Sequence, residues 1–422
     1  MRIKLLTKYY IRRISHDMGT LLKWLLLAAV TGLVVGGASS LFAGALKAVT
    51  GYRTEHKWVF LLLPVVGLLI VFLYQKIGKE DRGTNQVLST VRSQDDVPIR
   101  SAPLIFVSTI LTHLAGGSAG REGAAIQLGG SIGNQLGSWF RLDEEDRHVM
   151  VMCGMSAAFA AVFGTPMAAA VFAMEVVSVG VMYYAALVPC VMSSLIASRF
   201  AVGFGINAEV LQVAKIPELT VLSGIQMIVV SIACATISIL FCMALQNTTK
   251  LYQKYLKNPY VIVLTASVLI IGITLILQTD VYMGAGNELI EWAVEDGKAK
   301  PFDFFWKLVL TAITMRAGFR GGEIVPSFCI GATFGCVMGQ LVGLSPSLCA
   351  AAGMAAVFCG VTNCPITSIL IAFELFGLKG VAYYLIAVSI SYAVSGYYGL
   401  YKDQTIVYSK YKAKYVNRKT RN

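Results

Sequence analysis

Long apolar segments follow one another along almost the whole chain, and they constrain the fold more than any other feature. They lie near residues 20–50, 58–75, 149–203, 220–246, 258–279, 303–317, 324–360 and 365–400. About 20 residues of helix cross the hydrocarbon core of a bilayer, so these segments supply many membrane helices. Hydrophobic residues make up 56% of the 422 residues and charged residues only 14%, which excludes an ordinary soluble domain. The sequence therefore predicts an all-α polytopic membrane protein.

Positive charge is concentrated at the two ends of the chain. The net charge is +12, and much of it lies in residues 1–13 and in the tail 401–422, where Asp403 is the only acid. Basic segments next to membrane helices stay on the cytoplasmic side, so we expect both termini in the cytoplasm. The expected location is the cell inner (plasma) membrane. Attraction to anionic lipid accounts for the basic tails without a nucleic-acid partner.

Two other features of the sequence are interpreted as structural. The apolar run from Leu21 to about Val49 is too long for a signal-peptide core, so we expect it to be the first membrane segment. The nine cysteines are scattered singly, with no C-x-x-C motif and no histidine at metal-ligand spacing. We expect them to be small buried side chains, and we expect neither a metal nor another cofactor.

An internal repeat divides the chain. Residues 154–175 align without gaps with residues 353–374 at an offset of 199, with Gly, Met, Ala, Phe, Val, Pro, Ala and Glu identical. Residues 120–130 align with residues 321–331 at an offset of 201, which places Glu122 on Glu323. The repeat predicts two related membrane halves, residues 1–205 and residues 206–422.

Duplicated membrane halves of this size are typical of transporters, whose substrate site lies where the halves meet. Cytoplasmic termini fit either two halves with an odd number of spans, which would be inverted, or two even halves, which would be parallel. The apolar runs 101–115, 124–140 and 365–377 are shorter than a full span and end at Gly, Pro or charge. They predict broken or re-entrant helices that line a polar cavity.

Glycine-rich segments precede a predicted helix in each half, in GGSAGREG and in RAGFRGGE. The first N–H groups of a helix lack partners within the helix, and the helix dipole makes this end attractive to anions. In GTNQV, residues 83–87, we expect Thr84 or Asn85 to cap a third helix and to offer a side-chain donor. Together these starts predict an anion site whose backbone donors come from Gly123, Ala124, Ile324 and Val325.

Glu122 stands out in this environment, because a carboxylate repels an anion. Carboxylates in membrane interiors are costly and usually functional, often as proton carriers. A glutamate that competes with the anion for the same N–H donors would leave them when protonated, and anion and proton movements would then be coupled. The structural alternative is an ion pair with Arg121 or with a residue of another helix.

Three further glutamates follow from the repeat. Glu323 is either a second proton-linked or anion-organising carboxylate, or a structural partner of Arg316 or Arg320. Glu175 and Glu374 also correspond to each other. Because each ends an apolar helix, we expect both to be structural.

Taken together, these residues resemble the CLC family of chloride channels and transporters. The resemblance covers most of the chain and is carried by GREG around Glu122, by GGEIVP at residues 321–326, by the block at residues 154–175, and by the repeat. It implies a CLC-like inverted repeat of two halves with tilted and broken helices, and a homodimer with one pore per subunit. It also implies that Glu122 is the gating glutamate and that Tyr401 is the inner-gate tyrosine, with Tyr397 and Tyr398 as alternatives.

Three departures from chloride-handling members are similar to the fluoride/proton antiporter branch of the family. GTNQV stands where those members carry Gly-Ser-Gly-Ile-Pro, with Thr84 at the anion-contacting serine, although the fluoride branch more often has Met or Asn there. Val176 follows Glu175 where proton-coupled chloride exchangers often have a second acid, and Glu323 takes a position that is usually apolar.

The resemblance therefore implies a fluoride/proton antiporter that exports fluoride from the cytoplasm and is driven by proton influx. Glu122 and Glu323 are expected to couple the protons, and Thr84, Asn85 and Tyr401 to contact the anion. A chloride/proton exchanger and a passive anion channel are the alternatives. A channel needs a pore open at both ends, whereas two titratable carboxylates in line favour exchange.

An enzyme is a different class of function suggested by one motif. Residues 116–120 fit the G-x-S-x-G pattern of serine hydrolases. The strand–turn–helix context of that motif is missing, and His113 is only five residues from Ser118 instead of facing it from another helix. We therefore do not expect an enzyme.

Overall fold

The computed structural model describes residues 2–79, 81–93, 96–208, 210–412 and 414–421, with residues 2–12 described by their backbone alone. The helices of this part are α1 (Arg2–Glu55), α2 (Leu63–Lys76), α3 (Thr84–Thr90), α4 (Ser101–Leu114), α5 (Glu122–Trp139), α6 (Glu144–Phe163), α7 (Pro166–Glu175), α8 (Leu187–Gly203), α9 (Val221–Tyr255), α10 (Pro259–Leu277), α11 (Asn287–Val294), α12 (Asp303–Arg316), α13 (Ile324–Val342), α14 (Pro346–Thr362), α15 (Pro365–Phe376) and α16 (Val381–Val394). Two short 3-10 helices, Lys57–Leu62 and Tyr184–Ala186, precede α2 and α8.

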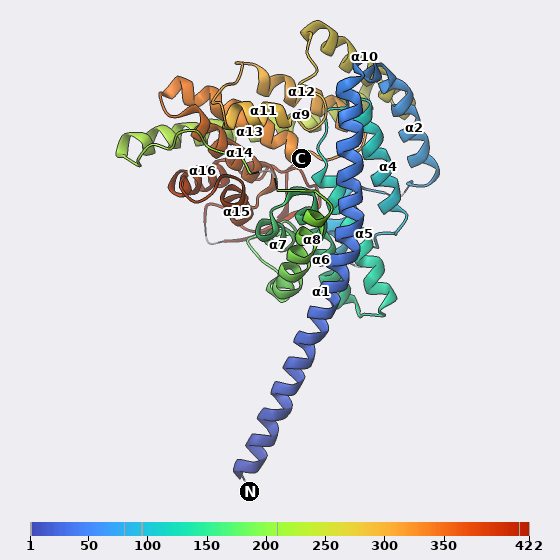
Figure 1. The fold of residues 1–422 in the computed structure, drawn as a ribbon, viewed down its shortest axis with the longest axis vertical. Coiled ribbons are helices and arrows are strands. Elements are labelled where there is room, and N and C mark those ends of the chain that lie inside the picture. Colours follow the sequence, from blue (N-terminus) through green and yellow to red (C-terminus); the bar gives the residue numbers. More distant parts are fainter. Residues whose placement is uncertain (1, 80, 94–95, 209, 413, 422) are drawn as a thin grey trace.

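The protein is an all-α polytopic membrane protein, as predicted. Six helical segments of the described part are long and apolar enough to cross a membrane: Arg13–Glu55, Lys57–Lys76, Tyr184–Gly203, Val221–Tyr255, Pro259–Leu277 and Ile324–Val342. The short runs expected to be broken helices form α4, α5 and α15, with bounds close to those expected. Figure 1 shows α1 running along one side of the helical body, with its N-terminal end projecting away from it.

Glycines allow the central helices of each half to pack at backbone distance. A Cβ added to Gly129 of α5 would lie 2.1 Å from the carbonyl oxygen of Gly154 in α6. In the second half, a Cβ added to Gly331 of α13 would lie 2.5 Å from the carbonyl oxygen of Gly353 in α14. Such close packing is common where membrane helices associate through small residues. The α5–α6 and α13–α14 pairs thus use the same device in both halves.

Glu175 and Glu374 form reciprocal caps between α7 and α15. Glu175, at the end of α7, accepts hydrogen bonds from the backbone N–H groups of Ile366 (3.1 Å) and Thr367 (2.9 Å) at the start of α15. Glu374, at the end of α15, accepts two of 2.9 Å from the first amides after Pro166 at the start of α7. The carboxylates satisfy N–H groups that a helix start leaves unpaired. Both glutamates therefore make the kind of contact expected of structural residues.

The reciprocity of these caps bears on how the halves are related. Because each helix ends where the other begins, α7 and α15 run antiparallel, although they are equivalent in sequence. A two-fold rotation about an axis in the membrane plane reverses one half relative to the other and produces such an exchange of contacts. A parallel repeat, whose axis lies along the membrane normal, does not. The division at residues 205 and 206 stays a prediction, and these contacts favour inverted over parallel halves.

A small sheet near the C-terminus was not foreseen from the sequence, which we interpreted only as a basic tail. Strand β1 (Ser178–Val179) pairs in parallel with β2 (Thr405–Tyr408), and β2 pairs antiparallel with β3 (Tyr415–Lys419). Between β1 and the bundle, the buried amide of Gln404 donates to the carbonyl oxygens of Val176 (2.9 Å) and Thr362 (2.6 Å). The sheet and Gln404 hold the segment around Tyr401 against the helices.

The reciprocal caps predict matched stability losses. Replacing Glu175 or Glu374 by Ala leaves two helix-start amides without their acceptor, at a cost of about 1–3 kcal/mol each. We expect each variant to lower the Tm of the detergent-purified protein while the folded fraction keeps its transport rate. Glu218→Ala, which removes an exposed carboxylate, is the control. A Glu175→Ala protein with normal Tm and lost proton coupling would show instead that Glu175 belongs to the transport machinery.

Candidate functional site

Two glycine-rich loops from the two halves of the chain are hydrogen-bonded to each other. The N–H group of Gly120 donates to the carbonyl oxygen of Gly322 (2.7 Å), and that of Gly322 donates to the carbonyl oxygen of Gly120 (2.8 Å). This antiparallel bridge lies directly before α5 and α13. The pairing therefore brings two helix starts together, as the sequence predicted for GREG and GGE.

The approach of these loops leaves no room for side chains. A Cβ added to Gly322 would lie 2.6 Å from the backbone nitrogen of Gly123. A Cβ added to Gly123 would in turn lie 3.0 Å from the Cα of Gly322. The expected anion-binding residues Gly123, Ala124, Ile324 and Val325 are all buried at these two starts. The first N–H groups of each helix have no acceptor within that helix and remain available to an anion.

The start of α3 joins the same region, but its cap differs from the prediction. We expected Thr84 or Asn85 to cap this helix, and that was wrong, because the N-cap is Gly83 with a φ of +68° and no side-chain cap. Glycine adopts this φ at no steric cost, unlike Thr. Thr84 is the first residue of α3, and its hydroxyl donates to the carbonyl oxygen of Gly123 (3.1 Å). Asn85 accepts a hydrogen bond of 3.4 Å from the N–H group of Asp403.

Glu122 is fully buried at the first position of α5. Its Oε2 accepts a hydrogen bond of 3.1 Å from the backbone N–H of Arg121, and its Oε1 lies 3.5 Å from the Arg121 Nε. The ion pair of the structural alternative is therefore present. The carboxylate also occupies a backbone donor at the helix start, which is what competition with an anion requires.

Glu323, which the repeat aligns with Glu122, is the N-cap of α13, directly before the first residue of that helix. Its Oε1 lies 3.2 Å from the Nη2 of Arg316, and 19% of its side chain is exposed. Arg320, the other candidate partner, places its guanidinium 3.7 Å above the ring of Tyr74. Each half thus carries one carboxylate at a paired helix start with an arginine beside it.

Tyr401 is buried, with 3% of its surface exposed, in the segment whose Asp403 N–H group donates to Asn85. The hydroxyl of Tyr397 instead forms a hydrogen bond of 3.1 Å with Ser409. Thr84, Asn85 and Tyr401 thus belong to one region, with the six other expected site residues.

One buried and one half-buried cation near this region were missed in the sequence. The ammonium group of Lys307 is fully buried and donates to the carbonyl oxygens of Tyr282 (3.0 Å) and Gly284 (2.7 Å). Arg53 donates to the carbonyl oxygen of His113 (2.7 Å). Lys307 interrupts the apolar run 303–317, and a charge inside such a run was the signal that could have revealed it.

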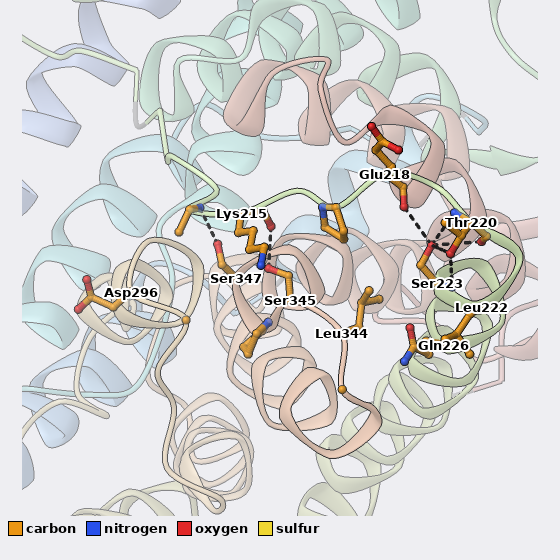
Figure 2. Close-up of a pocket in the computed structure, with 15 residues that line it drawn as sticks. Lys215, Glu218, Thr220, Leu222, Ser223, Gln226, Asp296, Leu344, Ser345 and Ser347 are labelled. Atoms are coloured by element: carbon orange, nitrogen blue, oxygen red, sulfur yellow. Dashed lines mark hydrogen bonds between the residues drawn. The ribbon is translucent and has the colours of Figure 1, made fainter.

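A cavity at the start of α9 is a separate feature. Its volume is about 710 Å³, and it lies between the start of α9, the start of α14 and the segment 214–220 (Figure 2). Its polar groups bind one another, as when Ser345 donates to the carbonyl oxygen of Lys215 (2.6 Å) and Ser347 accepts from the N–H of Ala214 (2.9 Å). None of the expected site residues lines it.

Comparison with known proteins gives consistent matches along the chain. The family model of the voltage-gated chloride channel matches residues 66–396. A chloride/fluoride channel protein of Pseudomonas syringae pv. tomato is 35% identical over 397 residues, which cover 92% of this chain and 88% of that protein. The H(+)/Cl(-) exchange transporter ClcA of Salmonella paratyphi B is 24% identical over 403 residues, which cover 88% of this chain and 85% of that protein.

A solved structure agrees with the fold over nearly the whole chain. The crystal structure of a CLC-type fluoride/proton antiporter superimposes with a TM-score of 0.87 at 33% identity. The alignment covers 91% of this chain and 98% of that one.

The close pairing of the loops predicts that Gly322→Ala impairs transport. The added methyl would press on the nitrogen of Gly123, and overpacking of this kind costs about 1–3 kcal/mol. We expect anion flux in proteoliposomes to fall about tenfold or more, with assembly unchanged by size exclusion. Gly224→Ala, a helical glycine with no atom near the added methyl, should transport normally. Normal flux through Gly322→Ala would show that the paired loops do not form the anion site.

Proposed function

The chain belongs to the voltage-gated chloride channel (CLC) family, and within that family we propose that it is a fluoride/proton antiporter. One observation carries this proposal: the buried carboxylate of Glu122 accepts a backbone N–H at the start of α5, beside a second carboxylate, Glu323, on the paired loop. The match to the CLC-type fluoride/proton antiporter supports it.

The anion is bound by converging helix starts. Fluoride is a small, strong hydrogen-bond acceptor, and it suits short N–H and O–H donors better than a larger anion does. The backbone amides of Gly123, Ala124, Ile324 and Val325 supply such donors, and Thr84, Asn85 and Tyr401 supply side-chain contacts. Neutral donors bind the ion without holding it as tightly as a fixed cation would.

Coupling follows from competition at the start of α5. While Glu122 is charged, it holds the N–H donor of Arg121 and repels the anion. When a proton neutralises Glu122, the carboxyl group gives up this donor and an anion takes its place. When Glu122 then releases its proton to the other side, the charged carboxylate takes the donor back and displaces the anion toward the side from which the proton came. Each cycle therefore moves anion and proton in opposite directions.

The two rival functions fit the site less well. A chloride/proton exchanger often carries a second acid after Glu175, but Val176 stands there, and Glu175 is engaged by the start of α15. A passive channel, as the name of the Pseudomonas relative suggests for that protein, needs an open pore. In this structure the side chains of Glu122 and Tyr401 are both buried, so the region is closed at each of these two residues.

We further propose that the protein is a homodimer in the cell inner (plasma) membrane, with both termini cytoplasmic, where a proton gradient directed inward drives fluoride out. The basic ends of the chain support this orientation. Anionic lipid accounts for the basic ends, so we propose no nucleic-acid partner.

The first functional test is coupled flux. In proteoliposomes followed by fluoride and proton electrodes, we expect fluoride efflux to be accompanied by proton uptake and to exceed chloride efflux clearly. Glu122→Gln, which cannot titrate, should lose the proton flux. Equal fluoride and chloride rates would move the protein to the chloride side of the family. Wild-type proton coupling in Glu122→Gln would remove this residue from the mechanism.

A second test separates function from structure at Glu323. Glu323→Gln should reduce fluoride transport or loosen coupling while the protein stays assembled. If Glu323 only neutralises Arg316, the single variant should instead misassemble, because an unpaired buried charge is strongly destabilising. The double variant Arg316→Gln with Glu323→Gln removes both charges and would then restore assembly and flux. Restored wild-type flux in the double variant would therefore contradict the functional interpretation.

A further inference from the structure

Two cavities occupy equivalent places in the two halves of the chain. The cavity beside the C-terminal part of α1 has a volume of about 570 Å³, and we name it the α1 cavity. The cavity beside the C-terminal part of α9 has a volume of about 190 Å³, and we name it the α9 cavity. The α1 positions are Ala43, Leu46, Lys47, Thr50, Gly51 and Thr54. The α9 positions are Cys242, Leu245, Gln246, Thr249, Lys250 and Gln253, each 199 residues later.

The sequences of these helices show the same relation. Residues 39–50, SSLFAGALKAVT, align with residues 238–249, SILFCMALQNTT, at the offset of 199. Ser, Leu, Phe, Ala, Leu and Thr are identical in this register. The two cavities are therefore one feature of the repeat, present once in each half.

Each cavity reaches the arginine of one arginine–glutamate pair. Arg121, beside Glu122, lines the α1 cavity, and Arg316, beside Glu323, lines the α9 cavity. A two-fold relation between the halves makes such cavities open toward opposite faces. With the N-terminus in the cytoplasm, the C-terminal part of α1 and its cavity lie toward the opposite face of the membrane. The α9 cavity therefore faces the cytoplasm.

The lining of the α9 cavity is suited to a small anion. Arg316, Lys250 and Lys402 contribute positive charge, and no acidic residue lines it in the described part. The Nε of Arg316 and the Nε2 of Gln246 are buried without a hydrogen-bond partner among the described residues. Buried N–H groups without an acceptor are costly, and an anion is the ligand that satisfies them and the charge together.

We propose that the α9 cavity is a binding site for a small inorganic anion at the cytoplasmic face, held by Arg316 and Gln246. The proposal rests on the proposed function only for the identity of the ion, fluoride, and for the side to which the site faces. Arg316 also binds Glu323 (3.2 Å), so an anion bound to Arg316 lies next to the proton-coupling carboxylate. The positive lining disfavours the cavity as an entrance for protons, which are repelled by the same charges.

Substitutions at Gln246 test the site with matched controls. Fluoride flux is measured against fluoride concentration in right-side-out and in inverted membrane vesicles, which present opposite faces to the medium. Loss of a hydrogen bond to an anion in Gln246→Leu should raise the half-saturating fluoride concentration about tenfold in inverted vesicles only. Gln246→Lys places a cation there, as Lys47 does in the α1 cavity, and should equal or improve on the wild type.

Two other variants fix the interpretation. Lys47→Leu should raise the half-saturating fluoride concentration in right-side-out vesicles instead. Gln226→Leu makes the same exchange on α9 but in the separate 710 Å³ cavity and should shift neither. If the protein carries chloride and not fluoride, the same series with chloride tests the site independently of the proposed function.

The proposal is overturned if Gln246→Leu and Gln246→Lys both keep wild-type half-saturation on both faces, or if Gln246→Leu shifts both faces equally. A shift in the proton dependence without any shift for the anion would also overturn it, and would identify the cavity as a proton entrance. If Gln246→Leu fails to assemble, Thr249→Val, which removes another polar group of the lining, takes its place with the same expected direction.

Discussion

The site depends on two backbone hydrogen bonds between Gly120 and Gly322. They bring together segments about 200 residues apart, each of which opens a helix at the protein centre. A helix start exposes N–H groups, and two starts side by side concentrate them in a small space. Any larger side chain at Gly322 would separate the loops, so the donors exist as a set only because glycine stands there.

The same pairing explains how two carboxylates are accommodated in the interior. A buried charge is costly unless it has a partner, and each carboxylate has an arginine within 3.5 Å. These pairs leave the carboxylates with different surroundings. Glu122 is fully buried and accepts a backbone hydrogen bond, whereas 19% of the Glu323 side chain is exposed and its carboxylate binds Arg316. The repeat therefore keeps the glutamate but not its hydrogen bonding.

Contacts at helix ends connect several distant segments of the chain. Glu175 and Glu374 lie at helix ends, and each accepts hydrogen bonds from backbone N–H groups at the start of the other's helix. These bonds hold α7 and α15 together. Thr84 and Asn85 instead connect α3 to the start of α5 and to the segment after Tyr401. The segment around Tyr401 is in turn fixed by the small sheet and by Gln404. Four chain segments thus meet around the two carboxylates.

Hydropathy, the repeat and the glycine-rich motifs by themselves determined the membrane class, the short broken helices and the correspondence of Glu122 with Glu323, because these are properties of local composition and spacing. Tertiary structure alone decided what depends on distant partners. It placed Gly83 at the cap of α3 in place of Thr84, because that cap needs a positive φ. It chose Arg316 over Arg320 as the partner of Glu323, because Arg320 stacks on the ring of Tyr74, a residue far away in the chain.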